Sequence, residues 1–421
     1  MNKKQNLKNK RKNLNLLLLI LFLIALCICS CQFLPVLPEK AKWTVLVYMD
    51  ADNDLERWAI DDFNEMETVS SLEDVNIIVQ TDRIPKDVLN SYGYYGIDDS
   101  SNGDWTTARR YLITEDSDIE LIHSILLEDL GEIDMGSPEA LRNFGYWGIA
   151  NYPADKYFII LWNHGNGFRS ITQTRGISWD LTNNNNYLAM SELSDAFAFI
   201  ANQAGKKIDI IGMDACLMAM TEVAYQIKDS SDILIASADN IPIEGWNYQD
   251  VFDIIVQDPE ISPEELAFEI IDIAFHDSEV STGNLKTQSA INLDYMTQLS
   301  QEIDLLAQSI IADNDTPIED YLAAVEITQT YNDIDFIDLK DFAANIANTS
   351  GNSSVVMAAK EIVETMSLGK AIINYGIDEN SFADSYGLSI YFPLDYYDSI
   401  YDELDFSHDT MWVEMINKIN L

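Results

Sequence analysis

The sequence predicts an α/β fold in which a mostly parallel β-sheet is flanked by helices on both faces. Short apolar stretches rich in β-branched residues alternate with longer stretches of helical spacing, in order along the chain. The predicted strands are 44–50, 75–80, 110–114, 156–162, 208–213 and 232–237. The predicted helices among them are 55–69, 137–150, 190–204 and 217–228.

Individual segments carry more specific signals. The stretch 156–162 (KYFIILW) is apolar almost throughout, which is typical of a strand buried on both faces of a parallel sheet. Ser137 and Pro138 provide a capping side chain and a first-turn proline at the start of a helix. Functional residues of such sheets lie beyond the carboxyl ends of the strands. The loops after residues 162, 213 and 237 are therefore the first candidates for a site.

The last third of the chain is predicted to be richer in helix. Its predicted helices are 263–277, 294–312, 318–330, 338–348 and 353–367, and its predicted strands are 287–293, 371–375 and 387–392. The sequence contains no internal repeat, no glycine-rich phosphate loop and no paired Cys/His spacing of a metal site. No metal ligand is predicted.

The first thirty residues have the pattern of an export signal. A basic stretch is followed by the apolar run 14–26 and then by three cysteines. Of these, Cys31 has Ile28 three residues before it and the small Ser30 directly before it, as a lipoprotein signal requires. We therefore expect cleavage after Ser30, lipidation of Cys31, and a spacer over 31–42. The alternative is an uncleaved N-terminal membrane anchor, for which the apolar run is short.

The charge balance is strongly acidic. The chain carries 25 basic and 70 acidic residues, a net charge of -45, and residues 1–30 hold six of the bases and none of the acids. A surface of this sign repels nucleic acid and attracts cations and basic peptides. Nucleic acid is therefore excluded as a partner, although solubility or a saline habitat would explain the acidity equally well.

Two strand ends carry residues suited to acyl transfer. His164 follows strand 156–162 and is succeeded by Gly165, and Cys216 follows strand 208–213. Cys216 is also the only cysteine after residue 31. A cysteine that opens the predicted helix 217–228 would have its thiolate stabilised by free N–H groups, and an adjacent imidazole would serve as its base. The alternative is that His164 is structural; His123, His276 and His408 are weaker candidates for the base.

Four segments in order resemble the clostripain family of cysteine peptidases. They are 43–56 (WTVLVYMDADNDLE), 161–167 (LWNHGNG), 210–223 (IIGMDACLMAMTEV) and 387–393 (GLSIYFP). The resemblance implies a caspase-like fold, shared with legumain and gingipain, and a dyad of His164 and Cys216. It implies a catalytic core over 43–285, with 286–421 as the C-terminal part of the same peptidase unit.

The resemblance also implies an endopeptidase that cleaves after Arg or Lys through a thioacyl-enzyme. Such a specificity requires a carboxylate that faces the basic side chain, and the candidates are Asp214, Asp239 and Glu244. Asp214 could instead cap a helix, and the other two could be solvated loop acids. Backbone N–H groups near Gly165 and Cys216 are the candidates for the oxyanion hole. The alternatives are a related peptidase of non-basic specificity and a non-catalytic, peptide-binding surface lipoprotein.

Two further expectations follow from the resemblance. Members of the family mature by cutting a loop between the dyad residues, and Arg175, in a polar stretch, is the predicted site. No cofactor is required, but calcium is associated with the enzyme that gives the family its name. The stretch Asp50-Ala51-Asp52-Asn53-Asp54 has the acid spacing of a calcium loop but lacks the glycine and distal glutamate of an EF-hand. The sequence therefore leaves calcium open.

Overall fold

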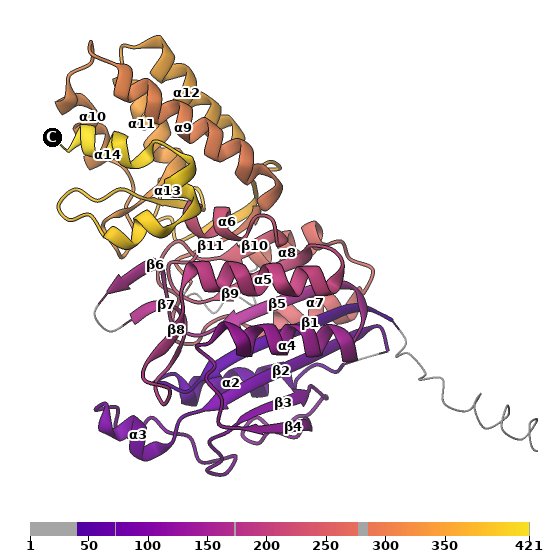
Figure 1. The fold of residues 1–421 in the computed structure, drawn as a ribbon. Helices are drawn as coiled ribbons and strands as arrows, with labels where there is room; N and C mark the ends of the chain where they lie inside the picture. Colours follow the sequence, from indigo (N-terminus) through magenta and orange to yellow (C-terminus); the bar gives the residue numbers. More distant parts are fainter. Residues whose placement is uncertain (1–39, 72, 172–173, 277–284, 421) are drawn as a thin grey trace, which may run out of the picture. The chain divides into compact units, whose positions relative to one another are not determined.

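The computed structural model describes residues 40–71, 73–171, 174–276 and 285–420 (Figure 1). Lys40–Leu421 forms one compact unit. The predicted signal segment and Cys31 lie outside the described residues.

Nine strands of the described residues form a central sheet in the order β13-β11-β10-β9-β5-β1-β2-β3-β4. The five strands from β10 to β2 run parallel, while β3, β4, β11 and β13 pair antiparallel at the two edges. The bounds are β1 Ala41–Ala51, β2 Val75–Arg83, β3 Ala108–Leu112, β4 Ile125–Gly131, β5 Ala154–Trp162, β9 Ile208–Asp214, β10 Ser231–Ala236, β11 Thr287–Asn292 and β13 Ile372–Ile377. The mostly parallel sheet predicted from the sequence is confirmed.

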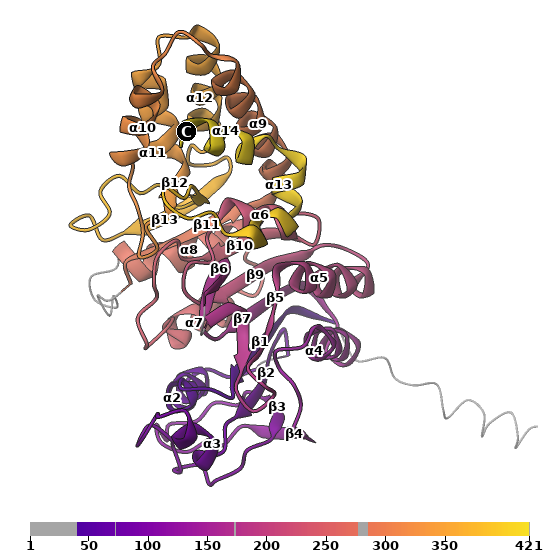
Figure 2. The ribbon, with the colours of Figure 1, turned by 60° about the vertical axis from the view of Figure 1, so that its left-hand side comes forward.

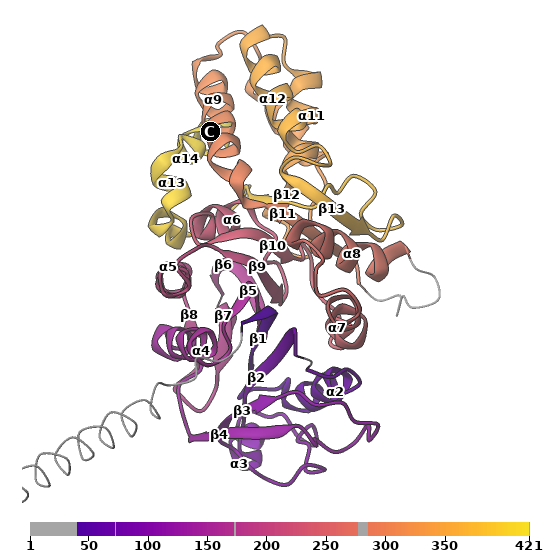
Figure 3. The same ribbon diagram turned by 90° about the vertical axis from the view of Figure 1, so that its right-hand side faces the viewer.

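Helices cover both faces of this sheet (Figure 3). One face packs against α4 (Pro138–Asn151), α5 (Met190–Ala204) and α6 (Thr221–Ile227); the other packs against α2 (Glu56–Met66), α7 (Tyr248–Gln257) and α8 (Pro263–His276). A hydrophobic core lies on each face of the sheet, and alternate residues of β1 point into one or the other. Leu46 and Tyr48 belong to the core on the first face, and Val45 and Val47 belong to the core on the second. All four side chains are fully buried. Because both faces of the central strands are buried, their sequences are almost continuously apolar.

The C-terminal part adds a helical layer on the side of the sheet formed by β13, β11 and β10 (Figure 2). Its helices are α9 Met296–Ala312, α10 Ile318–Glu326, α11 Leu339–Thr349, α12 Ser353–Thr365, α13 Asp405–Asp409 and α14 Trp412–Ile419, and β12 (Phe336–Asp338) pairs with β14 (Ser389–Tyr391). Strands β11 and β13 come from this part of the chain and complete the central sheet. The catalytic core and the C-terminal part thus share one sheet.

A small sheet follows the predicted catalytic histidine. It consists of β6 (Gly165–Ile171), β7 (Thr174–Asp180) and β8 (Asn186–Leu188), in the order β6-β7-β8. The sequence did not predict this sheet, nor β4, α7 or the short helix α3 (Lys86–Ser91). The prediction was also wrong about where α6 begins, because residues 217–220 are not helical.

Candidate active site

The register of two neighbouring strands brings the predicted dyad together. Strands β5 and β9 pair in parallel, with Trp162 opposite Asp214. His164 and Cys216 each lie two residues beyond this pair, and the backbone N–H of Asn163 continues the pairing by donating to the carbonyl of Asp214 at 3.3 Å. The imidazole and the thiol therefore emerge from adjacent strand ends, about one strand spacing apart.

Both side chains line one cavity of about 220 Å³. Its walls also include Asp54, Asp214 and the segment 241–243. The carboxyl edge of a parallel sheet, where this cavity lies, is where an α/β protein is expected to bind its ligand.

Cys216 does not open a helix, which corrects the sequence-based expectation. Helix α6 begins at Thr221, and the intervening residues are held in another way. Leu217 has a left-handed backbone (φ 62°), a strained conformation for a bulky residue. The N–H of Leu217 donates to the carbonyl of Asp239 at 3.1 Å, and that of Ala219 donates to the carbonyl of Ser237 at 2.8 Å. A tight turn anchored to the loop after β10 thus positions the thiol, and no helix terminus does so.

The environment of the thiol favours its protonated form. Burial raises the pKa of Cys216, and the negative charges of Asp214 and Asp239 add to this rise. The backbone N–H of Ile241, which donates to Sγ at 3.3 Å, acts in the opposite direction on the pKa. The thiol of the free protein therefore needs a base to become a nucleophile.

His164 has an acidic partner that the sequence analysis did not identify. Nε2 of His164 lies 2.9 Å from Oδ1 of Asp54, and both side chains are partly exposed at the cavity. Asp54 lies between β1 and α2, so the partner comes from the strand on the other side of β5 from Cys216. A carboxylate bound to one ring nitrogen fixes the orientation of the ring, so Nδ1 is the nitrogen that would serve as the predicted base.

Two asparagines hold this arrangement in place. Nδ2 of Asn163 donates to the carbonyl of Asp50 at 2.8 Å, and Nδ2 of Asn53 donates to the carbonyl of Trp179 at 2.9 Å. The carbonyl of Asp50 also accepts from Asn53 Nδ2 at 3.1 Å. These bonds join the end of β1, the end of β5 and the small sheet, so the loop that carries Asp54 is fixed relative to His164.

Gly165 lies against the nucleophile loop. A Cβ atom at Gly165 would lie 2.5 Å from the carbonyl oxygen of Cys216 and 2.9 Å from Cβ of Ala215. Only glycine allows the two loops to approach this closely. The two residues predicted for the oxyanion hole are therefore neighbours in space.

The three candidate specificity carboxylates occupy different places. Asp214 lines the cavity and is buried, and its Oδ2 accepts from the N–H of Trp246 at 3.1 Å and the hydroxyl of Tyr248 at 3.0 Å. Burial raises the pKa of Asp214 to about 7. Asp239 is buried outside the cavity lining and accepts from the N–H of Asn332 at 2.8 Å, and Glu244 is exposed on the loop. Of the three, Asp214 is the one at the cavity wall.

The other histidines lie elsewhere. His123 precedes β4 in a loop, not in a helix, and its exposed ring lies 3.3 Å from Asp118. His408 lies in the short helix α13. The side chain of His276 is outside the described residues.

The predicted processing site lies at one end of the small sheet, near the start of its central strand β7. Arg175 is the second residue of β7, where its backbone pairs with Ser170 of β6, and the hairpin tip at 172–173 is outside the described residues. The side chain of Arg175 is likewise not described. The expected polar loop is therefore the end of a β-hairpin.

A thiol and an imidazole at adjacent strand ends of a mostly parallel sheet form the arrangement of a cysteine peptidase. The model of the clostripain family matches residues 47–418, and the chain belongs to this family of cysteine peptidases. Clostripain of Hathewaya histolytica is 33% identical over 234 residues, which are 51% of this chain and 42% of clostripain. The matched region thus spans less than half of that relative's length.

Solved structures show the same fold. A secreted cysteine protease of Bacteroides thetaiotaomicron, in complex with an irreversible peptide inhibitor, superposes with a TM-score of 0.61 at 20% identity over 90% of this chain and 99% of its own. An inactive protease zymogen of Parabacteroides distasonis gives a TM-score of 0.63 at 21% identity over 89% and 99%. The caspase-like fold implied by the family resemblance is confirmed. Among the described residues, no helix is both long and apolar enough to traverse a lipid bilayer.

Proposed function

We propose that this protein is an endopeptidase that cleaves peptide bonds after Arg or Lys. Three side chains on one cavity support this proposal: Cys216 as the nucleophile, His164 as its base and Asp214 as the partner of the basic side chain. The net charge of -45 adds a long-range attraction for basic peptides.

The chemistry proceeds by acyl transfer. His164 takes the proton of Cys216, and Sγ forms a bond to the carbonyl carbon while backbone N–H groups near Gly165 and Cys216 hold the oxyanion. The tetrahedral intermediate collapses as the C–N bond breaks and His164 gives the proton to the leaving amine. A water molecule, deprotonated by His164, then releases the acyl group from sulfur. Asp54 orients the ring throughout.

Asp214 fits the specificity role for a physical reason. Its hydrogen bonds from Trp246 and Tyr248 both fall on Oδ2, and the structure gives Oδ1 no hydrogen bond within the described residues. A guanidinium or ammonium group in the cavity would pair with the carboxylate and favour its ionised form.

Hydrolysis of fluorogenic peptides ending in Arg, Lys, Asp or Leu tests this function, with residues 32–421 and the Cys216→Ala variant side by side. We expect the wild type alone to cleave, and only after Arg or Lys. Cleavage after Asp or Leu alone would keep the nucleophile and reject Asp214 as the specificity residue. Absence of cleavage by either protein, with calcium present and after limited trypsin treatment, would favour a non-catalytic, peptide-binding lipoprotein.

We further propose that maturation cuts the chain after Arg175. The other bases between the dyad residues are engaged. The guanidinium of Arg169 is buried and paired with Asp333 and Asp335, Lys206 contacts Asp209 at 2.6 Å, and Lys207 contacts Asp294 at 2.9 Å. An intact wild-type chain with full activity would contradict this proposal. The Arg175→Gln variant should remain one chain, and Arg57→Gln, at an exposed position of α2, should be cut like the wild type.

We also propose that the protein is exported and anchored to a membrane by lipid on Cys31. The support is the sequence pattern of residues 1–31. Metabolic labelling with a fatty acid, followed by membrane fractionation, tests it. Cys31→Ser should lose the label and leave the membrane fraction, while Cys29→Ser should keep both. Label retained in Cys31→Ser would show that another residue carries the lipid.

A further inference from the structure

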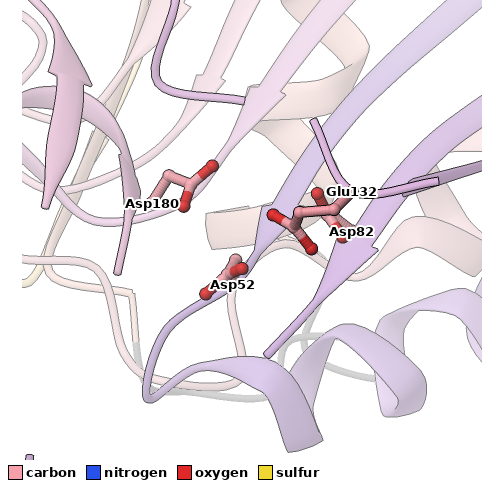
Figure 4. Close-up of side chains that lie close together, drawn as sticks. All are labelled: Asp52, Asp82, Glu132 and Asp180. Atoms are coloured by element: carbon pink, nitrogen blue, oxygen red, sulfur yellow. The ribbon is translucent and has the colours of Figure 1, made fainter. Parts of the chain in front are cut away.

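Four carboxylates from distant parts of the chain converge on one point, and one of them, Asp52, lies two residues before Asp54 (Figure 4). They are Asp52 after β1, Asp82 near the end of β2, Glu132 after β4 and Asp180 at the end of β7. Each offers an oxygen, and these four oxygens all lie within 4.8 Å of one another. Figure 4 shows the four side chains pointing toward one another.

The cluster is buried and lacks a countercharge. Asp52, Asp82 and Asp180 are fully buried, and only Glu132 is exposed. Among the described residues, no Lys or Arg forms an ion pair with any of the four. Arg83, directly after Asp82, donates instead to Glu56 at 2.6 Å. Buried charges are normally paired or bound to a metal ion, and the described side chains supply no positive partner for this cluster.

Unpaired oxygen atoms mark where that partner would lie. Oδ2 of Asp52 and Oδ2 of Asp82 are buried and have no hydrogen-bond partner among the residues that the structure describes. The other oxygen of each is engaged, since Asp52 Oδ1 accepts from the N–H of Thr182 at 3.1 Å and Asp82 Oδ1 accepts from the N–H of Arg83 at 2.8 Å. Unsatisfied buried acceptors require an explanation, and a bound ion is one.

The remaining ligands are held in position by the backbone. Asp180 Oδ2 accepts from the N–H of Met135 at 2.9 Å, and Asp180 Oδ1 accepts from the N–H of Asn183 at 2.9 Å. Glu132 Oε1 accepts from Nδ2 of Asn183 at 3.0 Å. Such contacts orient the ligands before any ion arrives.

We propose that Asp52, Asp82, Glu132 and Asp180 form a site for a calcium ion. All four donors are carboxylate oxygens, which calcium prefers and soft metals do not. Oxygens at about 2.3–2.6 Å from one calcium ion can be up to about 5 Å apart, whereas the shorter bonds of magnesium limit this spread to about 4.2 Å. The four oxygens, all within 4.8 Å of one another, lie in the range that calcium allows.

The electrostatics of the ion-free cluster agree with this assignment. Burial and the charge of Asp180 raise the pKa of Asp52 to about 8, and burial together with Glu132 raises the pKa of Asp82 well above its usual range. A divalent cation would remove this cost by restoring a countercharge. The sequence could not reveal the site, because Asp52 is its only ligand within the stretch 50–54.

Metal binding and thermal melting of the purified protein test the proposal independently of catalysis. After EGTA treatment and dialysis against calcium, we expect one calcium ion per chain by atomic emission. Calcium at 100 times its Kd should raise Tm by about 3 °C, and magnesium at the same concentration should raise it less. A calcium-induced rise below 1 °C, or a stoichiometry near zero, would overturn the proposal.

Isosteric variants separate this site from the acidic surface. Asp52→Asn and Asp82→Asn should lose the bound ion and the calcium-dependent rise in Tm. Their metal-free Tm should not be lower than that of the wild type, because the amide has the shape of the carboxyl group and carries no charge that would need a partner. Glu132→Gln, at the exposed ligand, provides a second variant if a buried change prevents folding. Asp395→Asn, on an exposed loop, should behave as the wild type, and an unchanged calcium response in Asp52→Asn and Glu132→Gln would assign the binding to the surface.

Discussion

Oδ1 of Asp54 lies 2.9 Å from Nε2 of His164, on the side of β5 away from Cys216. The dyad is thus extended to three residues from three adjacent strand ends. We predict that Asp54 acts through the imidazole, because its carboxylate contacts the ring. We therefore describe it as a positioning residue.

Asp54→Asn should lower kcat by roughly 10- to 100-fold, because an amide cannot stabilise the charged imidazolium as a carboxylate does. The alkylation rate of Cys216 by iodoacetamide gives a second readout. It should fall in Asp54→Asn and in His164→Ala, and the double variant should react like His164→Ala alone, because the two residues act as one unit. Additive losses in the double variant would show that Asp54 acts elsewhere.

Gly165→Ala should lower kcat by about 100-fold, because the added Cβ would meet the carbonyl oxygen of Cys216 at 2.5 Å and force the two catalytic loops apart. Gly351→Ala is the matched control, since a Cβ at Gly351 meets nothing within 4 Å. Kinetics of both variants on an Arg substrate, with melting curves, would check this. Unchanged kcat in Gly165→Ala would mean that the loops adjust without cost.

The sequence predicted the central sheet well because its strands are buried on both faces. The stretches that became β1, β5 and β9 are apolar runs of strand length, and a parallel sheet is the arrangement that buries them. Strand β4 gave no such signal, because it lies at the edge and most of its residues are exposed. Its apolar and acidic side chains follow no clear alternation.

The sequence predicts that His164 and Cys216 form a dyad, but it does not predict what surrounds them. His164 and Cys216 stand at the ends of recognisable strands, whereas Asp54 is one of 70 acidic residues and only the folded chain selects it. The predicted start of α6 was wrong for a related reason. Leu217 and Met218 are buried, and a short apolar stretch is compatible with either a helix or the buried turn that the structure has.

The selectivity for basic residues should depend on pH through Asp214. Burial raises the pKa of this carboxyl to about 7, so a growing fraction is neutral below that pH and attracts Arg weakly. The ratio of kcat/KM for an Arg peptide to that for a Leu peptide cancels the titration of the dyad. This ratio should rise about 10-fold per pH unit below pH 6 and level off above pH 8. In Asp214→Asn this ratio should be low and independent of pH. A wild-type ratio that does not change with pH would assign the specificity to another residue.

The stability of the protein should fall between mildly acidic and neutral pH. Glu222 is fully buried, with the hydroxyl of Tyr401 at 2.9 Å, and Asp338 is fully buried, with the hydroxyl of Tyr331 at 2.9 Å. Burial raises the pKa of each carboxyl to about 7, whereas the pKa values in the unfolded chain are about 4. Between these values the folded state binds protons that the unfolded chain has lost, so raising the pH favours unfolding.

Glu222→Gln should therefore reduce the loss of Tm between pH 5 and pH 8 by about 2 °C relative to the wild type, because the amide has no proton to lose. Glu379→Gln, at an exposed position, should follow the wild-type curve. Differential scanning calorimetry across this range measures the effect. Other buried carboxyls also contribute to the change of Tm with pH in the wild type. The decisive quantity is therefore the difference between Glu222→Gln and Glu379→Gln in the loss of Tm from pH 5 to pH 8. Parallel curves for both would mean that Glu222 is ionised in the folded protein and that its tyrosine partners stabilise the charge.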